Sequence, residues 1–176
     1  LTEENKGVVT AAVRDAAAAL ARAHPELILF ADSRAFLNRF KDISIKCNDS
    51  EAAALTGGAV SKSFDREAVF ASLQTLQQRT DRPVFVTCNR HGIAAMDNGT
   101  PHLLPAVKQT GPLDVVGAGD ASTAGMVSAL CAGASPAEAA AFANLCAGVT
   151  VRKLGTTGTA APDEVLAIFG EGQAAP

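Results

Sequence analysis

The sequence predicts an α/β fold in which a mainly parallel sheet is covered by helices on both faces. Apolar runs of strand length alternate with helical patterns along the chain, as is typical of parallel βαβ units. Polar residues directly follow several of these strands. The length of 176 residues, with 48% hydrophobic and 19% charged residues, suits a single globular domain over residues 1–176.

Helix and strand signals alternate through the first half of the chain. We expect a helix over 8–24, a buried strand over 27–31, a short helix near 34–40 and a second strand over 43–46. Residues 47–51 then enter a short helix that Gly57 and Gly58 stop. Asp65 is the expected N-cap of a helix over 66–79, and a third strand covers 83–87.

The second half carries a hairpin signal and three helices. Asn98 and Gly99 predict a tight turn between apolar runs at 93–96 and 103–104. Helices are expected over 117–132, from a capping box at Ser135–Glu138 to about Lys153, and from Pro162 to Phe169, with a polar loop over 155–159 and a frayed tail from Gly170.

The most informative stretch is Asp-Val-Val-Gly-Ala-Gly-Asp at residues 114–120, which runs straight into the helix over 117–132. Two glycines allow a tight turn and a close backbone approach to a ligand. The first N–H groups of the helix and its dipole favour an anion there. A carboxylate at Asp120 beside such an anion site suits phosphoryl transfer. The alternative is a tight turn with an aspartate that only caps a helix.

Further polar residues are expected at the same place in the fold. Asp32 follows the first strand, Asn48 and Glu51 follow the second, and Thr87 ends the third. Ligands of parallel sheets bind at the carboxyl ends of the strands, which share one edge. The sequence therefore predicts that these residues and the glycine-rich turn converge on one rim.

Charge and cysteine usage exclude several function classes. A net charge of −3 with scattered Lys and Arg argues against a nucleic-acid partner. No apolar run approaches the ~20 residues of a membrane span, and no signal peptide pattern opens the chain. Cys47, Cys88, Cys131 and Cys146 form no C-x-x-C pair, and the three histidines share no ligand spacing, so we expect reduced thiols, no zinc site and a cytoplasmic location.

In these motifs the chain resembles the C-terminal part of a PfkB/ribokinase-family carbohydrate kinase. The family signature Asp-Thr-x-Gly-Ala-Gly-Asp matches residues 114–120, and the family's Asn-x-x-Glu matches 48–51. The strand ending in Thr87 with a turn at Gly92, and Asn144 in a late helix, follow in family order. Residues 6–10 and 151–159 are similar to the heptose-7-phosphate kinase domain of lipopolysaccharide biosynthesis, which is a lead on the substrate.

The resemblance implies a ribokinase-like, Rossmann-type three-layer sandwich and a role for each matched residue. Asp120 would be the general base, and the amides of Gly117, Ala118 and Gly119 would form the anion hole. Asn48 and Glu51 would organise Mg²⁺, through water, and the phosphates of ATP. Thr87, Gly92 and Asn144 would line the adenine-nucleotide pocket, while Asp114 and the loop near Gly155 would be candidates for a K⁺ site.

Each of these residues also has a purely structural explanation. Asn48 and Glu51 would form a helix capping box, Thr87 would be a turn residue, and Asn144 would face solvent. Asp32 and Arg34 would be an exposed turn pair. Cys47, Asn89 and Val115 depart from the common family residues Pro, Gly and Thr, without removing a residue that has a chemical role.

The family's other half is the larger departure. Relatives have an N-terminal half with further strands, sugar contacts and a lid, and this chain begins at Leu1 without an initiator Met, so we expect it to be part of a longer kinase. We also expect an exposed sheet edge that favours aggregation or a homodimer, and no turnover by this segment alone, since substrate positioning and water exclusion need the other half.

The function favoured by the sequence is transfer of the γ-phosphoryl group of MgATP to a hydroxyl of a sugar or sugar phosphate. Two alternatives remain: a module that binds adenine nucleotide without catalysis, and a nucleoside or vitamin-precursor kinase of the same fold. The intact Asp120 argues against the first of these, and only the loop over 153–159 argues against the second.

Overall fold

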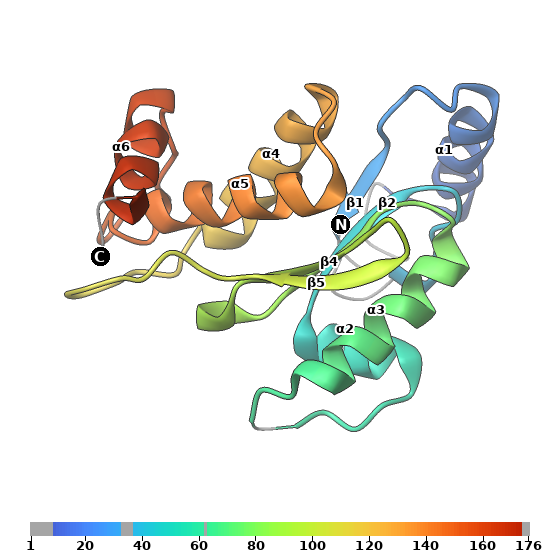
Figure 1. Cartoon of the computed structure of the whole chain (residues 1–176). Coiled ribbons are helices and arrows are strands. Elements are labelled where there is room, and N and C mark those ends of the chain that lie inside the picture. The colour runs from blue at the N-terminus through green and yellow to red at the C-terminus, as the bar shows by residue number, and fades with distance from the viewer. Residues whose placement is uncertain (1–8, 33–36, 62, 174–176) are drawn as a thin grey trace. The chain divides into compact units, whose positions relative to one another are not determined.

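The computed structural model describes residues 9–32, 37–61 and 63–173 (Figure 1). Within these residues the chain forms five strands and six α-helices. It divides into two compact units, the first within Leu1–Cys88 and Ala94–His102, the second within Asn89–Ile93 and Leu103–Pro176. The expectation of a single domain over residues 1–176 stays a prediction.

The five strands form one sheet in the order β1-β2-β3-β4-β5, with strands Phe30–Asp32, Ser44–Asn48, Val84–Thr87, Ile93–Asp97 and Thr100–Leu104. Apart from Ile93, Leu103 and Leu104, the residues of this sheet belong to the first unit. The pairs β1–β2 and β2–β3 are parallel, as predicted from the alternation of strands and helices. Asn48 lies opposite Thr87 in the register of β2 and β3. The parallel strands therefore bring these two predicted site residues to the same end of the sheet.

Local capping rules explain the helices of this unit. Thr10 caps α1 (Ala11–Ala23) and Asp65 caps α3 (Arg66–Thr80), each by accepting a backbone N–H bond. Between them, α2 (Asp49–Thr56) ends at Gly57 in the left-handed conformation. The face of α3 predicted to be apolar is buried, with Val69, Leu73 and Leu76 at most 5% exposed.

The hairpin between β4 and β5 follows the turn signal in the sequence. Asn98 and Gly99 have φ values of 48° and 78°. Positive φ at both central residues is the requirement of the type I′ turn, which Asn-Gly meets at low cost.

The second unit is helical, with α4 (Ala118–Cys131), α5 (Pro136–Thr150) and α6 (Pro162–Gln173). A Cβ at Gly125 of α4 would lie 3.0 Å from the Cys146 sulfur and 3.1 Å from Cα of Ala143, so this glycine allows the close packing of α4 on α5. Val149 of α5 and Val165 and Ile168 of α6 join Cys146 in a buried apolar cluster.

Some predicted boundaries were wrong. The strand expected over 27–31 begins only at Phe30, because the Leu27 N–H donates to the His24 carbonyl in a turn after α1. Helix α1 begins at Ala11, and the short helix near 34–40 is a 3-10 turn at Leu37–Arg39, with 33–36 outside the described residues.

The ends of the last two helices also differ. Helix α5 stops at Thr150 rather than Lys153, because the Val151 carbonyl accepts a bond from the Asp114 N–H. Helix α6 continues to Gln173, past its predicted end at Phe169, and Arg152 binds the Glu171 carboxylate in its last turn.

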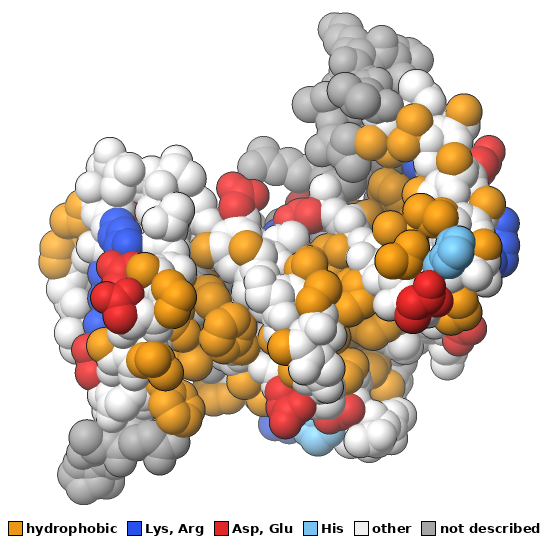
Figure 2. Space-filling model, turned by 90° about the horizontal axis from the view of Figure 1, so that it is seen from above, with side chains coloured by type: hydrophobic (Ala, Val, Ile, Leu, Met, Phe, Trp, Pro, Cys, Tyr) orange, Lys and Arg blue, Asp and Glu red, His pale blue; other side chains and the backbone are white. Residues whose placement is uncertain are grey.

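Apolar side chains also reach the surface, where they appear as orange areas in Figure 2. The exposed large ones are Val13, Leu20, Leu27, Val60, Leu113, Val115, Val116, Phe142, Leu154, Leu166 and Phe169. Scattered apolar exposure is ordinary for a folded protein. Among the described residues, no helix has the length and apolarity needed to cross a bilayer.

Candidate active site

A glycine turn opens helix α4, as the sequence predicted. Gly117 has φ 82° and ψ −8°, the values of the third position in a type II turn, which requires glycine. The turn closes when the Ala118 N–H donates to the Val115 carbonyl at 3.2 Å. A Cβ at Gly117 would lie 2.8 Å from the Thr157 methyl carbon, so the residue also allows the loop over 155–159 to pack on the turn.

The start of α4 leaves backbone donors open. The helical ladder begins where the Ala121 N–H donates to the Gly117 carbonyl at 2.9 Å. The N–H groups of Gly117, Gly119 and Asp120 have no acceptor within the described part of the chain. Of the three amides predicted to bind an anion, that of Ala118 is therefore already used in the turn. The Asp120 N–H is a further open donor, which the sequence analysis did not predict.

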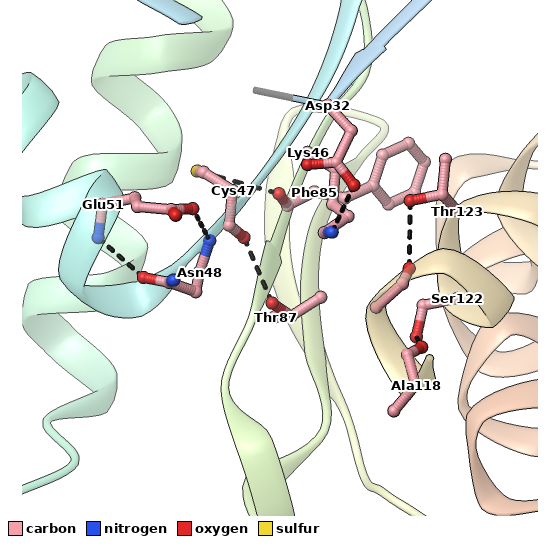
Figure 3. Close-up of polar contacts among 11 residues, drawn as sticks. Asp32, Lys46, Cys47, Asn48, Glu51, Phe85, Thr87, Ala118, Ser122 and Thr123 are labelled. Atoms are coloured by element: carbon pink, nitrogen blue, oxygen red, sulfur yellow. Dashed lines mark hydrogen bonds and ion pairs between the residues drawn. The ribbon is translucent and has the colours of Figure 1, made fainter. Parts of the chain in front are cut away.

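Asp120 is the third residue of α4, and its side chain is exposed. Its carboxylate has no hydrogen-bond or ion-pair partner among the residues described, and α4 has no side-chain cap. The alternative in which this aspartate only caps the helix therefore does not describe the structure. Ser122 and Thr123 use their hydroxyls to bind the Ala118 and Gly119 carbonyls (Figure 3).

Asp114 fixes the other end of the turn. Its carboxylate oxygens accept the N–H groups of Val116 and Gly155, each at 3.0 Å. The bond from Val116, followed by that from Gly155, lowers the pKa of Asp114 below its ordinary value. These two donors use about two of the four acceptor positions of a carboxylate, so the side chain retains capacity for a cation.

Asn48 and Glu51 form a complete capping box at the start of α2 (Figure 3). The Glu51 N–H donates to Asn48 Oδ1, and the Asn48 N–H donates to Glu51 Oε2, both at 2.8 Å. The structural explanation of this pair is therefore confirmed. The Asn48 amide nitrogen and Glu51 Oε1 make no hydrogen bond with another described residue, so the cap leaves one polar atom of each for a ligand.

Two neighbouring contacts stand at the same end of the sheet. The Thr87 hydroxyl donates to the Cys47 carbonyl at 3.3 Å, which bridges β3 and β2. Lys46 donates to the Asp32 carboxylate at 2.5 Å across β2 and β1 (Figure 3). Asp32 is therefore not a free turn residue, and Arg34, its expected companion, lies outside the described residues. Lys46 is a single cation in a strand with apolar neighbours, and this pattern could have indicated an acidic partner on the next strand.

Gly92 and Asn144 meet at one carbonyl group. A Cβ at Gly92, which has φ 104°, would lie 1.9 Å from the Leu104 oxygen. Asn144 is 6% exposed, and its amide nitrogen donates to that same oxygen at 2.8 Å. The alternative in which Asn144 faces solvent is therefore wrong. Asn89, which replaces a common family glycine, has φ 50°, a conformation that asparagine tolerates.

The cysteines behave as predicted for buried thiols. Cys47, Cys88 and Cys146 are buried, Cys131 is exposed, and all four are free. Burial raises the pKa of Cys88 to about 12, and it also raises the pKa values of Cys47 and Cys146. The described residues contain no cluster of three or more His, Cys, Asp or Glu side chains that would hold a metal ion.

The predicted site residues fall into two groups. Asn48, Glu51 and Thr87 belong to the first unit, and Gly92, Asp114, the turn over 117–120 and Asn144 belong to the second. In the second group the structure joins Gly92 and Asn144 at the Leu104 carbonyl, and it joins Asp114 to the glycine turn through the Val116 N–H. Convergence of the two groups on one rim stays a prediction.

Residues 6–164 match the family described as pfkB family carbohydrate kinase. Two curated relatives are both named Bifunctional protein HldE. The one from Caulobacter sp. (strain K31) is 36% identical over 174 residues, which is 97% of this chain and 35% of the relative. The one from Pelobacter propionicus is 30% identical over 169 residues, 94% of this chain and 34% of the relative.

Solved structures show the same fold. Phosphofructokinase-2 from Escherichia coli in complex with potassium has a TM-score of 0.74 and 18% identity, over 93% of this chain and 53% of that one. Arabidopsis thaliana ribokinase with ribose and ATP has a TM-score of 0.70 and 21% identity, over 90% and 51%.

The chain thus spans about a third of these HldE relatives, at 35% and 34%, and about half of the two solved chains, at 53% and 51%. The likeness to the solved structures confirms the expected ribokinase-like α/β fold. The match over residues 6–164 covers most of the sequence. The chain belongs to the pfkB family of carbohydrate kinases.

Proposed function

We propose that this chain is the nucleotide-binding, base-bearing part of a kinase that transfers the γ-phosphoryl group of MgATP to a hydroxyl of a sugar or sugar phosphate. The observation that carries the proposal is the start of α4, where backbone N–H groups and the exposed Asp120 carboxylate lie together without a partner among the described residues. Membership in a family of carbohydrate kinases supports the acceptor class.

Asp120 would act as the general base. As the acceptor oxygen forms its bond to the γ-phosphorus, the bond from this phosphorus to the β,γ-bridging oxygen breaks, ADP leaves, and the hydroxyl proton moves to the Asp120 carboxylate. The amides of Gly117 and Gly119, with that of Asp120, would donate to the oxygens of the transferring group, where charge builds up. Ala118 would contribute by closing the turn that aims these donors.

Asn48 and Glu51 would face the phosphates and Mg²⁺. The donor set fits a hydrated ion: Glu51 is half-buried, its Oε2 is held by the cap, and its Oε1 makes no hydrogen bond with another residue that the structure describes. Mg²⁺ keeps several waters and binds through few carboxylates; when bound it would offset phosphate charge. The Asn48 cap fixes Glu51 in one orientation, so one pair of residues would serve both fold and ligand.

Thr87, Gly92 and Asn144 would line the nucleotide pocket by placing backbone. Because Asn144 is buried and holds the Leu104 carbonyl, it would act on the pocket wall formed by the segment after β5. Because Gly92 has no Cβ, that segment would pack against the Gly92 backbone more closely than any side chain at this position would allow. Asp114 and the loop near Gly155 would be the K⁺ site, for which the spare acceptor positions of Asp114 provide one ligand.

A transfer assay with a panel of acceptors tests the proposal. We expect the full-length protein that carries these residues to transfer phosphate from MgATP to a sugar or sugar phosphate, with heptose 7-phosphate as the first acceptor to try. Transfer only to a nucleoside or vitamin precursor would replace the acceptor class. Nucleotide binding without transfer to any acceptor would favour the non-catalytic binding module.

A further inference from the structure

The loop over 155–159 connects the end of α5 with α6, and it touches the glycine turn over 114–117 that opens α4. At its start, the Gly155 N–H donates to Asp114 at 3.0 Å. In its middle, Thr157 is the residue that a Cβ at Gly117 would strike at 2.8 Å. The position of the turn over 114–117 is therefore coupled to the position of this loop.

Lys153 holds the far end of the same loop. Its ammonium group donates to the Thr159 carbonyl at 2.5 Å and to Glu164 Oε2 at 2.8 Å. The Ala161 N–H donates to that Glu164 oxygen at 2.9 Å, so the carboxylate ties the loop end to the first turn of α6. Along the stem of Lys153, a Cβ at Gly158 would come within 3.0 Å of Cδ, which shows how closely the loop lies over this side chain.

The next ion pair along the chain provides a contrast. Arg152 binds Glu171 at 2.9 Å and Gln109 at 2.8 Å, and none of its bonds reaches the loop over 155–159. Figure 2 shows Lys and Arg side chains against Asp and Glu side chains at the edge of the molecule that carries α6. Two adjacent basic residues thus bind the same helix, but only one of them also holds the loop.

We infer that Lys153, with Glu164, is a positioning residue that acts through the loop over 155–159; it holds the turn over 114–117 and with it the start of α4, which carries the anion-binding amides and Asp120; this rests on the proposed function. Exposed ion pairs contribute little to stability. Lys153 and Glu164 are only 31% and 36% exposed, and Lys153 makes charge-assisted bonds to two groups, a class of bond stronger than neutral ones. The pair therefore fixes the position of the loop end relative to the first turn of α6.

Amide hydrogen exchange of the 176-residue chain, measured by NMR, tests this inference without any need for activity. Lys153→Met keeps the apolar stem under Gly158 and removes both bonds. We expect the Gly155 and Val116 amides, which donate to Asp114, to exchange at least about tenfold faster, because the loop and the turn open more often once the charge-assisted bonds of Lys153 are lost. The matched control Arg152→Met should leave both rates within about twofold, because its partners lie elsewhere. Glu164→Gln is the second variant, with a minimal change of shape.

Turnover in the full-length protein provides the second readout. Lys153→Met should lower kcat and leave the affinity for MgATP unchanged, since the turn aims the base and the transferring group. Equal exchange in the Lys153 and Arg152 variants, or an unchanged kcat with faster exchange, would overturn the inference. If the wild-type protein transfers no phosphate, it is the proposed function that fails, and the exchange comparison still decides whether Lys153 holds the turn.

Discussion

The close approach at Gly92 provides the sharpest test of the structure. Gly92→Ala places a methyl group 1.9 Å from the Leu104 oxygen, 2.6 Å from the Ala106 nitrogen and 2.8 Å from the Pro105 carbonyl carbon, whereas ordinary contacts begin at 3.4 Å. The contacted atoms are backbone, so they cannot turn aside as a flexible side chain would. The Leu104 carbonyl must retreat by roughly the difference between 1.9 and 3.4 Å, which breaks its 2.8 Å bond from Asn144.

The expected cost has two parts. A left-handed alanine costs about 1–2 kcal/mol, and the orphaned, buried Asn144 amide adds about 1–3 kcal/mol. We therefore expect Gly92→Ala to lower the free energy of unfolding by about 2–5 kcal/mol, and by more if the backbone distorts. Gly99→Ala is the matched control, because Gly99 also has positive φ but nothing lies within 4 Å of its added Cβ, so only about 1–2 kcal/mol applies.

Urea unfolding followed by far-UV circular dichroism measures both variants, since the chain contains no Trp or Tyr for fluorescence. The reasoning is refuted if Gly92→Ala costs no more than Gly99→Ala. Removing only the bond, with Asn144→Leu in the wild-type background, should cost less than Gly92→Ala, because the Leu104 carbonyl then stays in place.

Three further predictions follow from the contacts of single side chains. Asn48→Ala should lower the free energy of unfolding by about 0.5–2 kcal/mol through loss of the cap of α2. Asn48→Ser keeps a capping hydroxyl and should fold normally, but calorimetry should show weaker binding of MgATP than in the wild-type protein. Equal affinity of Asn48→Ser and the wild-type protein for MgATP would exclude Asn48 from the site. Cys131 is the exposed thiol and the other three cysteines are buried. Mass spectrometry should therefore show that iodoacetamide modifies Cys131 alone in the native chain and all four thiols in the urea-unfolded chain. Bonds from Lys153 and Ala161 lower the pKa of Glu164 below its ordinary value of 4.5. The ionised Glu164 carboxylate therefore stabilises the folded protein fully above that value, and this stabilisation is lost as the pH falls through the lower pKa of the folded state. Glu164→Gln should accordingly flatten the fall in Tm between about pH 5 and 3.

Local signals in the sequence predicted much of the fold. Asn48 with Glu51, Ser135 with Glu138, and Asn98 with Gly99 each act over three residues or fewer, and the structure has the capping boxes and the turn at these positions. Such patterns are readable because the interacting groups are neighbours in the chain.

Contacts between distant residues could not be predicted in the same way. The Leu104 carbonyl accepts from Asn144, 40 residues away, and nothing in either local pattern indicates the pairing. The bond of Lys46 to Asp32 depends on the register of β1 and β2. The turn bond that engages Ala118 requires the backbone angles of Gly117, which the motif allows but does not specify.

The kinase proposal depends most directly on Asp120 as the base. Single-turnover transfer from MgATP in the full-length protein should fall by about 10²–10⁴-fold in Asp120→Asn, while calorimetry shows unchanged affinity for MgATP. Asp163→Asn is the matched control, since Asp163 is also an exposed acid in the first turn of a helix, and it should retain the wild-type rate. A near wild-type rate in Asp120→Asn would contradict the account.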